Sequence, residues 1–116
     1  METRQSLRKQ LYKIANELPI HERYNLAAQI KAAAISLTSN IAEGFGRYHY
    51  KENIQFCRIA RESACELLDH LTTCLDEGYV STTQHERLGQ ELEIFMRVLN
   101  GYIKAIGSLD SSFRRE

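Results

Sequence analysis

Apolar residues recur along the chain at the three-to-four-residue spacing of amphipathic helices. The first run begins at Leu7 and ends at Leu18, because the following Pro19 disfavours helical geometry in the residue before it. Ser81 and Gln84 form a capping box ahead of the last run, which extends from Leu88 to Ile106. The spacing predicts helices at about residues 4–18, 21–43, 51–76 and 82–106, followed by a frayed tail at 107–116.

Four amphipathic helices with short connections and no strand pattern predict an all-α fold. The expected architecture is an antiparallel up-down-up-down four-helix bundle, with residues 1–116 as one domain and the first helix the shortest. A length of 116 residues suits a single core. The polar start and the absence of a stretch of about 18 apolar residues predict a cytoplasmic protein without a membrane segment.

The second predicted helix is almost without charge, since Lys31 is the only charged residue between Tyr24 and Ala42. Steps of 100° per residue place one apolar set on the core side and a second set on nearly the opposite side. The second set needs another partner, so we expect a homo-oligomer. The alternative is that these are scattered surface apolar residues, which are common. The expected interface residues are Tyr24, Ala28 and Ile35, with Ile94 and Val98 of the last helix.

The chain has 15 basic and 15 acidic residues and a net charge of zero, which excludes a strongly cationic DNA-coating protein. The charges are divided unevenly along it. Residues 1–61 hold ten Lys and Arg against five Asp and Glu, and residues 62–116 hold five against ten. A local basic surface is therefore compatible with the neutral total.

The step from basic to acidic lies within the third predicted helix and opposes the helix dipole. Backbone N–H groups at a helix start attract phosphate, and aromatic rings stack on unpaired bases. The expected nucleic-acid-binding residues, which combine these features, are Arg47, Lys51, Arg58, Arg61, Tyr48 and His49. The alternative is that the rings pack the turn between helices, while the charges pair with Glu43 or across protomers.

The sequence contains no pattern typical of catalysis. Its histidines, at positions 21, 49, 70 and 85, are not spaced four residues apart, and no Glu-x-x-His pair occurs on two helices. Gly44 and Gly46 lack the following Gly and Lys of a phosphate-binding loop. We expect no metal, no cofactor and no enzymatic activity.

The segment Ser39–Arg47, with the sequence SNIAEGFGR, resembles the 23S rRNA-intervening sequence proteins, often labelled the S23 ribosomal protein family. The likeness continues at Gly78–Ser81 and Leu99–Ile103 and covers about residues 7–106. It implies a small bacterial antiparallel bundle that assembles as a ring, commonly a pentamer. The family is also similar in fold to the accessory variability protein of diversity-generating retroelements, a pentameric barrel that binds nucleic acid and a reverse transcriptase.

The motif of this family is expected to fix the turn between the second and third helices, and direct ligand contact is the alternative. Its members here are Ser39, Asn40, Glu43, Gly44 and Gly46. The glycines suit positive φ angles, and Glu43 is expected to pair with Arg47 or with a cation of another helix or subunit. Family members usually have a proline where Thr38 stands, so a kink in the second helix should be softened or absent.

These features predict a non-enzymatic homo-oligomer that binds RNA or DNA weakly and without strong sequence preference. Repetition of a modest basic patch around a ring would raise avidity without raising net charge. The alternative is a protein-interaction scaffold whose acidic half docks a basic partner, such as a reverse transcriptase or another polymerase.

Overall fold

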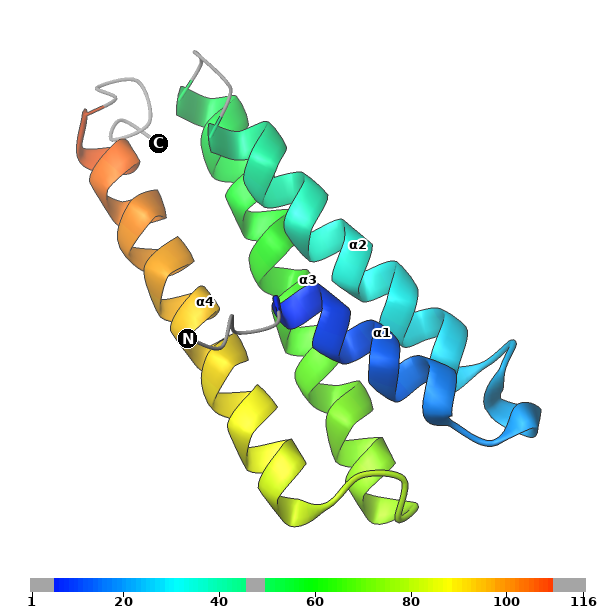
Figure 1. Cartoon of the computed structure of the whole chain (residues 1–116). Helices are drawn as coiled ribbons and strands as arrows, with labels where there is room; N and C mark the ends of the chain where they lie inside the picture. Colours follow the sequence, from blue (N-terminus) through cyan, green and yellow to red (C-terminus); the bar gives the residue numbers. More distant parts are fainter. Residues whose placement is uncertain (1–5, 46–49, 110–116) are drawn as a thin grey trace, which may run out of the picture.

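The computed structural model describes residues 6–45 and 50–109 and contains four α-helices there (Figure 1). They are α1 (Leu7–Glu17), α2 (Leu26–Phe45), α3 (Tyr50–Asp76) and α4 (Thr82–Leu109), and a short 3-10 turn, η1 (Ile20–Glu22), separates the first two. No strand occurs within these two ranges. The predicted all-α bundle is therefore confirmed.

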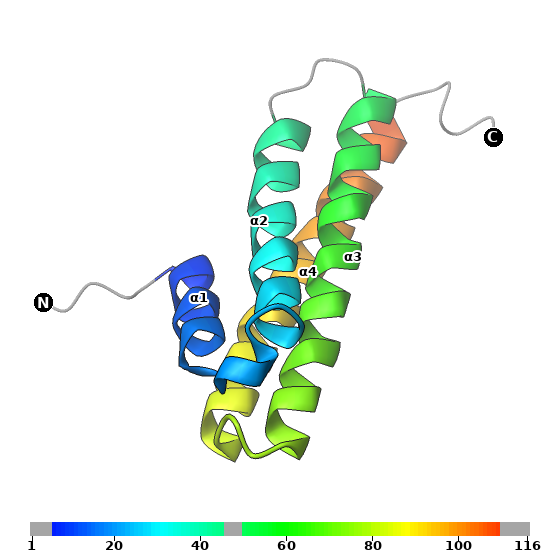
Figure 2. The same ribbon diagram turned by 90° about the vertical axis from the view of Figure 1, so that its right-hand side faces the viewer.

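The short α1 covers only part of the bundle. It has 11 residues and is about 16 Å long, whereas α3 has 27 residues and is about 40 Å long. Figures 1 and 2 show α1 beside the half of the bundle that contains the α3–α4 turn. The other half, where α2 and α4 end, consists of three helices. The sequence predicts this difference because the first apolar run is the shortest.

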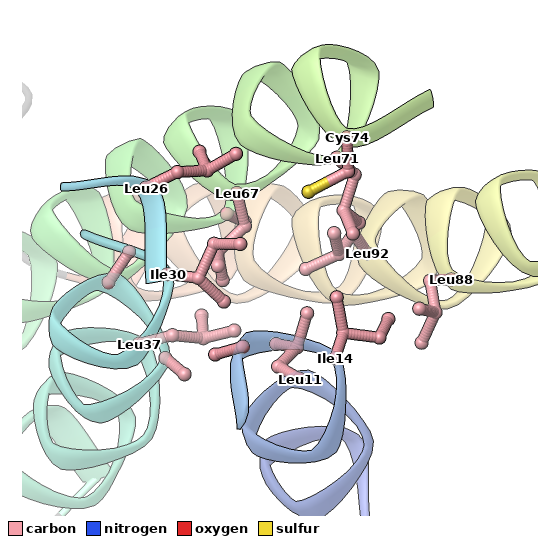
Figure 3. Close-up of a cluster of buried hydrophobic side chains, with 14 of the residues drawn as sticks. Leu11, Ile14, Leu26, Ile30, Leu37, Leu67, Leu71, Cys74, Leu88 and Leu92 are labelled. Atoms are coloured by element: carbon pink, nitrogen blue, oxygen red, sulfur yellow. The ribbon is translucent and has the colours of Figure 1, made fainter. Parts of the chain in front are cut away.

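All four helices contribute side chains to one hydrophobic core (Figure 3). The side chains point from the four helices toward a common centre, which is the arrangement that the helical spacing of apolar residues predicts. Its labelled members are Leu11 and Ile14 of α1, Leu26, Ile30 and Leu37 of α2, Leu67, Leu71 and Cys74 of α3, and Leu88 and Leu92 of α4.

Capping interactions define three of the helix ends. Ser81 and Gln84 form the predicted capping box: the Ser81 N–H donates to Gln84 Oε1 and the Gln84 N–H donates to Ser81 Oγ, both at 3.1 Å. The α3 helix ends at Asp76, and Gly78 in the following turn has a φ of 77°, which suits a glycine. There the Tyr79 N–H donates to the Cys74 carbonyl oxygen at 2.7 Å, as in a Schellman motif.

The start of α1 and the start of α2 differ from the prediction. The first helix was expected from residue 4 and begins at Leu7, because Ser6 is extended and its Oγ accepts a hydrogen bond from the Lys9 N–H. The second helix was expected from residue 21. Residues 20–22 instead form η1, and Glu22 in this turn accepts a hydrogen bond from Tyr79 Oη at 3.0 Å. This tertiary contact was not visible in the local pattern.

The ends of the helices also differ from the expected bounds. The α1 helix ends at Glu17, one residue early, α3 begins at Tyr50, one residue early, and α2 continues to Phe45 instead of ending at residue 43. The expected frayed tail, 107–116, is helical to Leu109 because Ile106 and Gly107 are buried and hold the last turn in place. Residues 110–116 lie outside the described ranges.

The three cysteines are predicted to differ in reactivity. Burial raises the pKa of the Cys57 thiol, and burial together with the Glu22 carboxylate raises the pKa of Cys74 to about 11, whereas Cys65 is exposed. The thiolate is the reactive form. An aromatic disulfide reagent at pH 8 should therefore label one thiol in the native protein and three after unfolding. Equal labelling of all three in the native state would contradict this expectation.

The raised pKa of the Cys74 thiol predicts a loss of stability in alkaline solution. The pKa of Cys74 in the folded chain lies above its ordinary value of 9.0. The neutral thiol therefore adds stability below pH 9, and this contribution is lost as the pH rises toward 11.

Candidate interaction surfaces

The family motif forms a polar seam between α2 and α3. The Asn40 side-chain amide donates to the Ser36 carbonyl oxygen at 2.8 Å and to Ser36 Oγ at 3.1 Å. Ser63 Oγ of α3 donates to Ser36 Oγ at 2.8 Å, and Ser39 Oγ donates to the Ile35 carbonyl oxygen at 2.7 Å. The Ser63–Ser36 bond joins α3 to α2, whereas Asn40 and the exposed Ser39 bond within α2. This pattern favours the expectation that this part of the motif has a structural role.

Gly44 has a different role from the expected one. It lies inside α2, and Gly78 is the glycine with positive φ among the described residues. A Cβ atom at Gly44 would lie 3.3 Å from each of three α3 atoms: the Asn53 carbonyl oxygen, Cys57 Sγ and Phe56 Cβ. Gly44 therefore permits close approach of α2 and α3 instead of capping the helix. Gly46 lies outside the described residues.

Thr38 replaces the usual proline of the family without interrupting α2. Its hydroxyl group donates to the carbonyl oxygens of Ala34 and Ile35 at 3.3 and 3.2 Å. A threonine retains the backbone N–H that a proline lacks, so the helix continues through this position. The α2 helix is uninterrupted from Leu26 to Phe45, and the softened kink stays a prediction.

The predicted nucleic-acid patch is described only in part. Lys51 and Arg58 are exposed, and their spacing of seven residues places both on one face of α3. Each also has an interaction partner. Arg61 is half-buried, and its Nη1 donates to Asn100 Oδ1 at 2.7 Å, which directs it toward α4. The remaining members, Arg47, Tyr48 and His49, lie outside the described residues.

The predicted change from basic to acidic residues along α3 occurs on the exposed surface of the helix. The basic residues of its first turns are followed by four exposed acids, at positions 62, 66, 69 and 76. Glu43, at the end of α2, is exposed and has an interaction partner. Its expected contact Arg47 lies outside the residues that the structure describes.

The residues expected at an oligomer interface are uncovered in the single chain. The exposed fractions are 87% for Tyr24, 49% for Ile35, 55% for Ile94 and 59% for Val98, and Ala28 is also exposed. None of these side chains belongs to the core of the protomer. Exposure is what an interface between copies requires, and the subunit count stays a prediction.

A second basic surface, which the sequence analysis did not assign, lies along α1. Two adjoining clefts of about 600 and 380 Å³ share Asn16 as a lining residue. We call this surface the α1–α2 basic groove. Its cations are Arg8, Lys9 and Lys13 of α1, Arg23 of the connector and Lys31 of α2. The available signal was the four-residue spacing of Lys9 and Lys13, with no acid in that helix before Glu17.

Residues 6–45 and 50–109 contain neither a metal-binding cluster nor a helix able to span a membrane. In these ranges no group of three or more His, Cys, Asp or Glu side chains is arranged to hold a metal ion. None of the helices described there combines the length and apolar character that crossing a membrane requires.

The fold and the motif define a class of protein, the small antiparallel α-helical bundles with the SNIAEGFGR segment. The sequence pattern of the 23S rRNA-intervening sequence proteins matches residues 2–101, and the chain belongs to this family. The resemblance seen in the sequence is thereby confirmed.

A solved structure of the S23 ribosomal protein family, a protein of unknown function from Bacteroides thetaiotaomicron VPI-5482, has a similar fold. The TM-score is 0.69 at 19% sequence identity, and the alignment covers 85% of this chain and 99% of that chain. At this identity the likeness shows the fold alone. Comparison with curated proteins found no match.

Proposed function

We propose that the protein is a non-enzymatic, cytoplasmic homo-oligomer that binds RNA or DNA weakly and with little sequence preference. The contact surface is the basic patch at the α2–α3 turn, and the observation that carries the proposal is the exposed position of Lys51 and Arg58 on one face of α3. Cations that contact phosphates supply affinity that depends little on base sequence.

The oligomer part of the proposal is supported by apolar side chains that the protomer leaves uncovered. Ile35 on α2 and Ile94 and Val98 on α4 are each about half exposed. Complete burial of such a side chain contributes about 1.5–3 kcal/mol, which favours a contact between copies. The family resemblance implies a ring, commonly a pentamer, in which one modest patch is repeated and its avidity increases. The likeness to the accessory variability protein stays a prediction.

A second candidate function is supported by the acidic end of α3. Glu62, Glu66 and Asp69 are exposed together, and the next acid on this helix, Asp76, is exposed as well. A basic partner protein, such as a polymerase, would be attracted to this surface. The protein would then act as an interaction scaffold or accessory subunit.

Binding of labelled single-stranded RNA across a salt series tests the proposed function. We expect retention at about 50 mM salt and a steep loss of affinity as salt increases, since each phosphate contact adds about −0.7 to the logarithmic slope for single strands. Arg47→Ala and Lys51→Ala should each weaken binding and reduce this slope. Arg87→Ala removes an exposed cation near the start of α4, beside the α3–α4 turn; it is the matched control and should leave both unchanged.

The same experiment distinguishes the two candidates. Absence of RNA retention by the wild-type protein at about 50 mM salt would contradict nucleic-acid binding, because phosphate contacts are strongest at low salt. Retention of a basic polypeptide under those conditions, weakened by Glu62→Gln and Glu66→Gln, would then support the scaffold.

A further inference from the structure

Among the described residues, the α1–α2 basic groove is lined by five cations and one acid and so has an excess of positive charge. Arg8, Lys9 and Lys13 are exposed, and in the described part of the chain none of them forms an ion pair or a side-chain hydrogen bond. Glu17 is the acid that lines the groove. A ligand with negative charge would therefore meet cations that are not already engaged by carboxylates.

The arrangement of these cations is unfavourable for the helix itself. Lys9 and Lys13 are four residues apart, so their like charges lie on one face and repel. Arg8 and Lys9 lie in the first turn of α1, where the helix dipole favours acids, and this turn contains none. Folding of α1 gains nothing from this pattern. An anion bound in the groove would remove both sources of repulsion.

Two cations of the groove, Lys31 of α2 and Arg23 of the connector, lie against aromatic rings. Lys31 Nζ lies 5.6 Å from the centre of the Tyr12 ring, and Arg23 Cζ lies 5.6 Å from the centre of the Tyr24 ring. Such cation–π contacts restrict flexible side chains. Tyr12 is half-buried in the groove lining, whereas Tyr24 is 87% exposed and presents most of its ring to solvent.

The acid of the connector, Glu22, is held by a contact outside the groove. Glu22 Oε2 accepts a hydrogen bond from Tyr79 Oη at 3.0 Å, which ties the connector to the α3–α4 turn. His21 Nε2 lies 3.3 Å from the same tyrosine oxygen. The connector therefore contributes Arg23 to the groove, whereas the carboxylate of its Glu22 is engaged by Tyr79 at the α3–α4 turn.

From these observations we propose that the α1–α2 basic groove is a second contact surface for single-stranded RNA or DNA, and this inference rests on the proposed function. Arg8 to Lys13 span about 7.5 Å along α1, and Arg23 and Lys31 continue the positive surface onto the connector and α2. This extent suits successive phosphates of a strand better than one isolated phosphate. Rings beside cations are typical of surfaces that stack unpaired bases, and this feature favours a nucleic acid over an acidic peptide.

Fluorescence anisotropy with a labelled single-stranded RNA of about 20 nucleotides tests the groove. The double variant Lys9→Ala, Lys13→Ala should bind at least tenfold more weakly at low salt, and its logarithmic salt slope should fall in magnitude by about 1.4, or 0.7 for each lost contact. Lys9→Arg, Lys13→Arg should bind as the wild type does. Arg87→Ala, Arg97→Ala removes the same charge from exposed positions on α4 and is the matched control.

The outcomes separate this inference from the proposed function. Wild-type affinity in Lys9→Ala, Lys13→Ala, together with weaker binding by Lys51→Ala, Arg58→Ala, would overturn the groove and leave the α3 patch in place. No binding by the wild type would overturn both. A poly-glutamate peptide that competes as well as unlabelled RNA, or a smaller particle mass in the double variant, would also overturn the inference, because the groove would then hold an acidic segment or a second copy.

Discussion

The Ile35→Asp variant is expected to behave as a single 13.4 kDa protomer, whereas we expect the wild-type chain to form a larger assembly. Ile35 is 49% exposed in the protomer, so a charge at this position leaves the bundle intact. At a contact between copies, the same carboxylate would be buried without a partner at a cost of about 3–5 kcal/mol. A tenfold change in the dissociation constant corresponds to about 1.4 kcal/mol. The dissociation constant of the assembly should therefore increase at least a hundredfold.

Light scattering on the eluted peak at micromolar concentration measures this change. Gln55→Asp places the same charge at an exposed position on α3 and should retain the wild-type mass. Circular dichroism should show the same helical signal for all three proteins. A wild-type mass of 13.4 kDa at this concentration would show a monomer. That result would contradict both the proposed assembly and the repetition of the basic patch around it.

The Gly44→Leu variant is expected to lower the free energy of unfolding by about 1–3 kcal/mol, the usual cost of overpacking a close contact. Three α3 atoms already lie 3.3 Å from the position of a Cβ atom at Gly44. One of them is a backbone carbonyl oxygen of α3, which a leucine side chain displaces only by separating the two helices. Urea unfolding followed by circular dichroism gives the change.

Gly89→Ala is the matched control for this prediction. Gly89 lies inside α4, and a Cβ atom there would make an ordinary contact of 3.8 Å with Leu68 Cδ2. Alanine at a helix interior is more stable than glycine by about 0.5–1 kcal/mol, so this variant should gain stability. An equal gain in Gly44→Ala would show that the α2–α3 contact yields easily, contrary to the role argued for Gly44.

The α3 basic patch and the α1–α2 basic groove are expected to act on the same RNA strand. The end of α2 and the start of α3 lie at one end of the bundle, whereas α1 lies along the opposite half (Figure 1). One strand that contacts both surfaces would gain affinity from the second contact through its high local concentration. Variants at the two surfaces would then show losses that are not independent of each other.

The sequence by itself determined the number of helices, the core and the turn between α3 and α4. Core residues such as Leu67 and Leu92 follow the helical period, and the period depends only on local backbone geometry. The capping box at Ser81 and the end of α3 before Gly78 were predictable for the same reason, because their hydrogen bonds join neighbouring residues. The family motif between positions 39 and 47 was equally visible.

The tertiary structure decided which of these residues approach one another. The connector forms η1 because Glu22 meets Tyr79, which is 57 residues away in the sequence. Gly44 belongs to a helix contact instead of a cap, because α3 passes beside it. The α1–α2 basic groove depends on Lys31 lying against Tyr12. Each of these contacts joins separate elements, and a local pattern contains no information on which elements pack together.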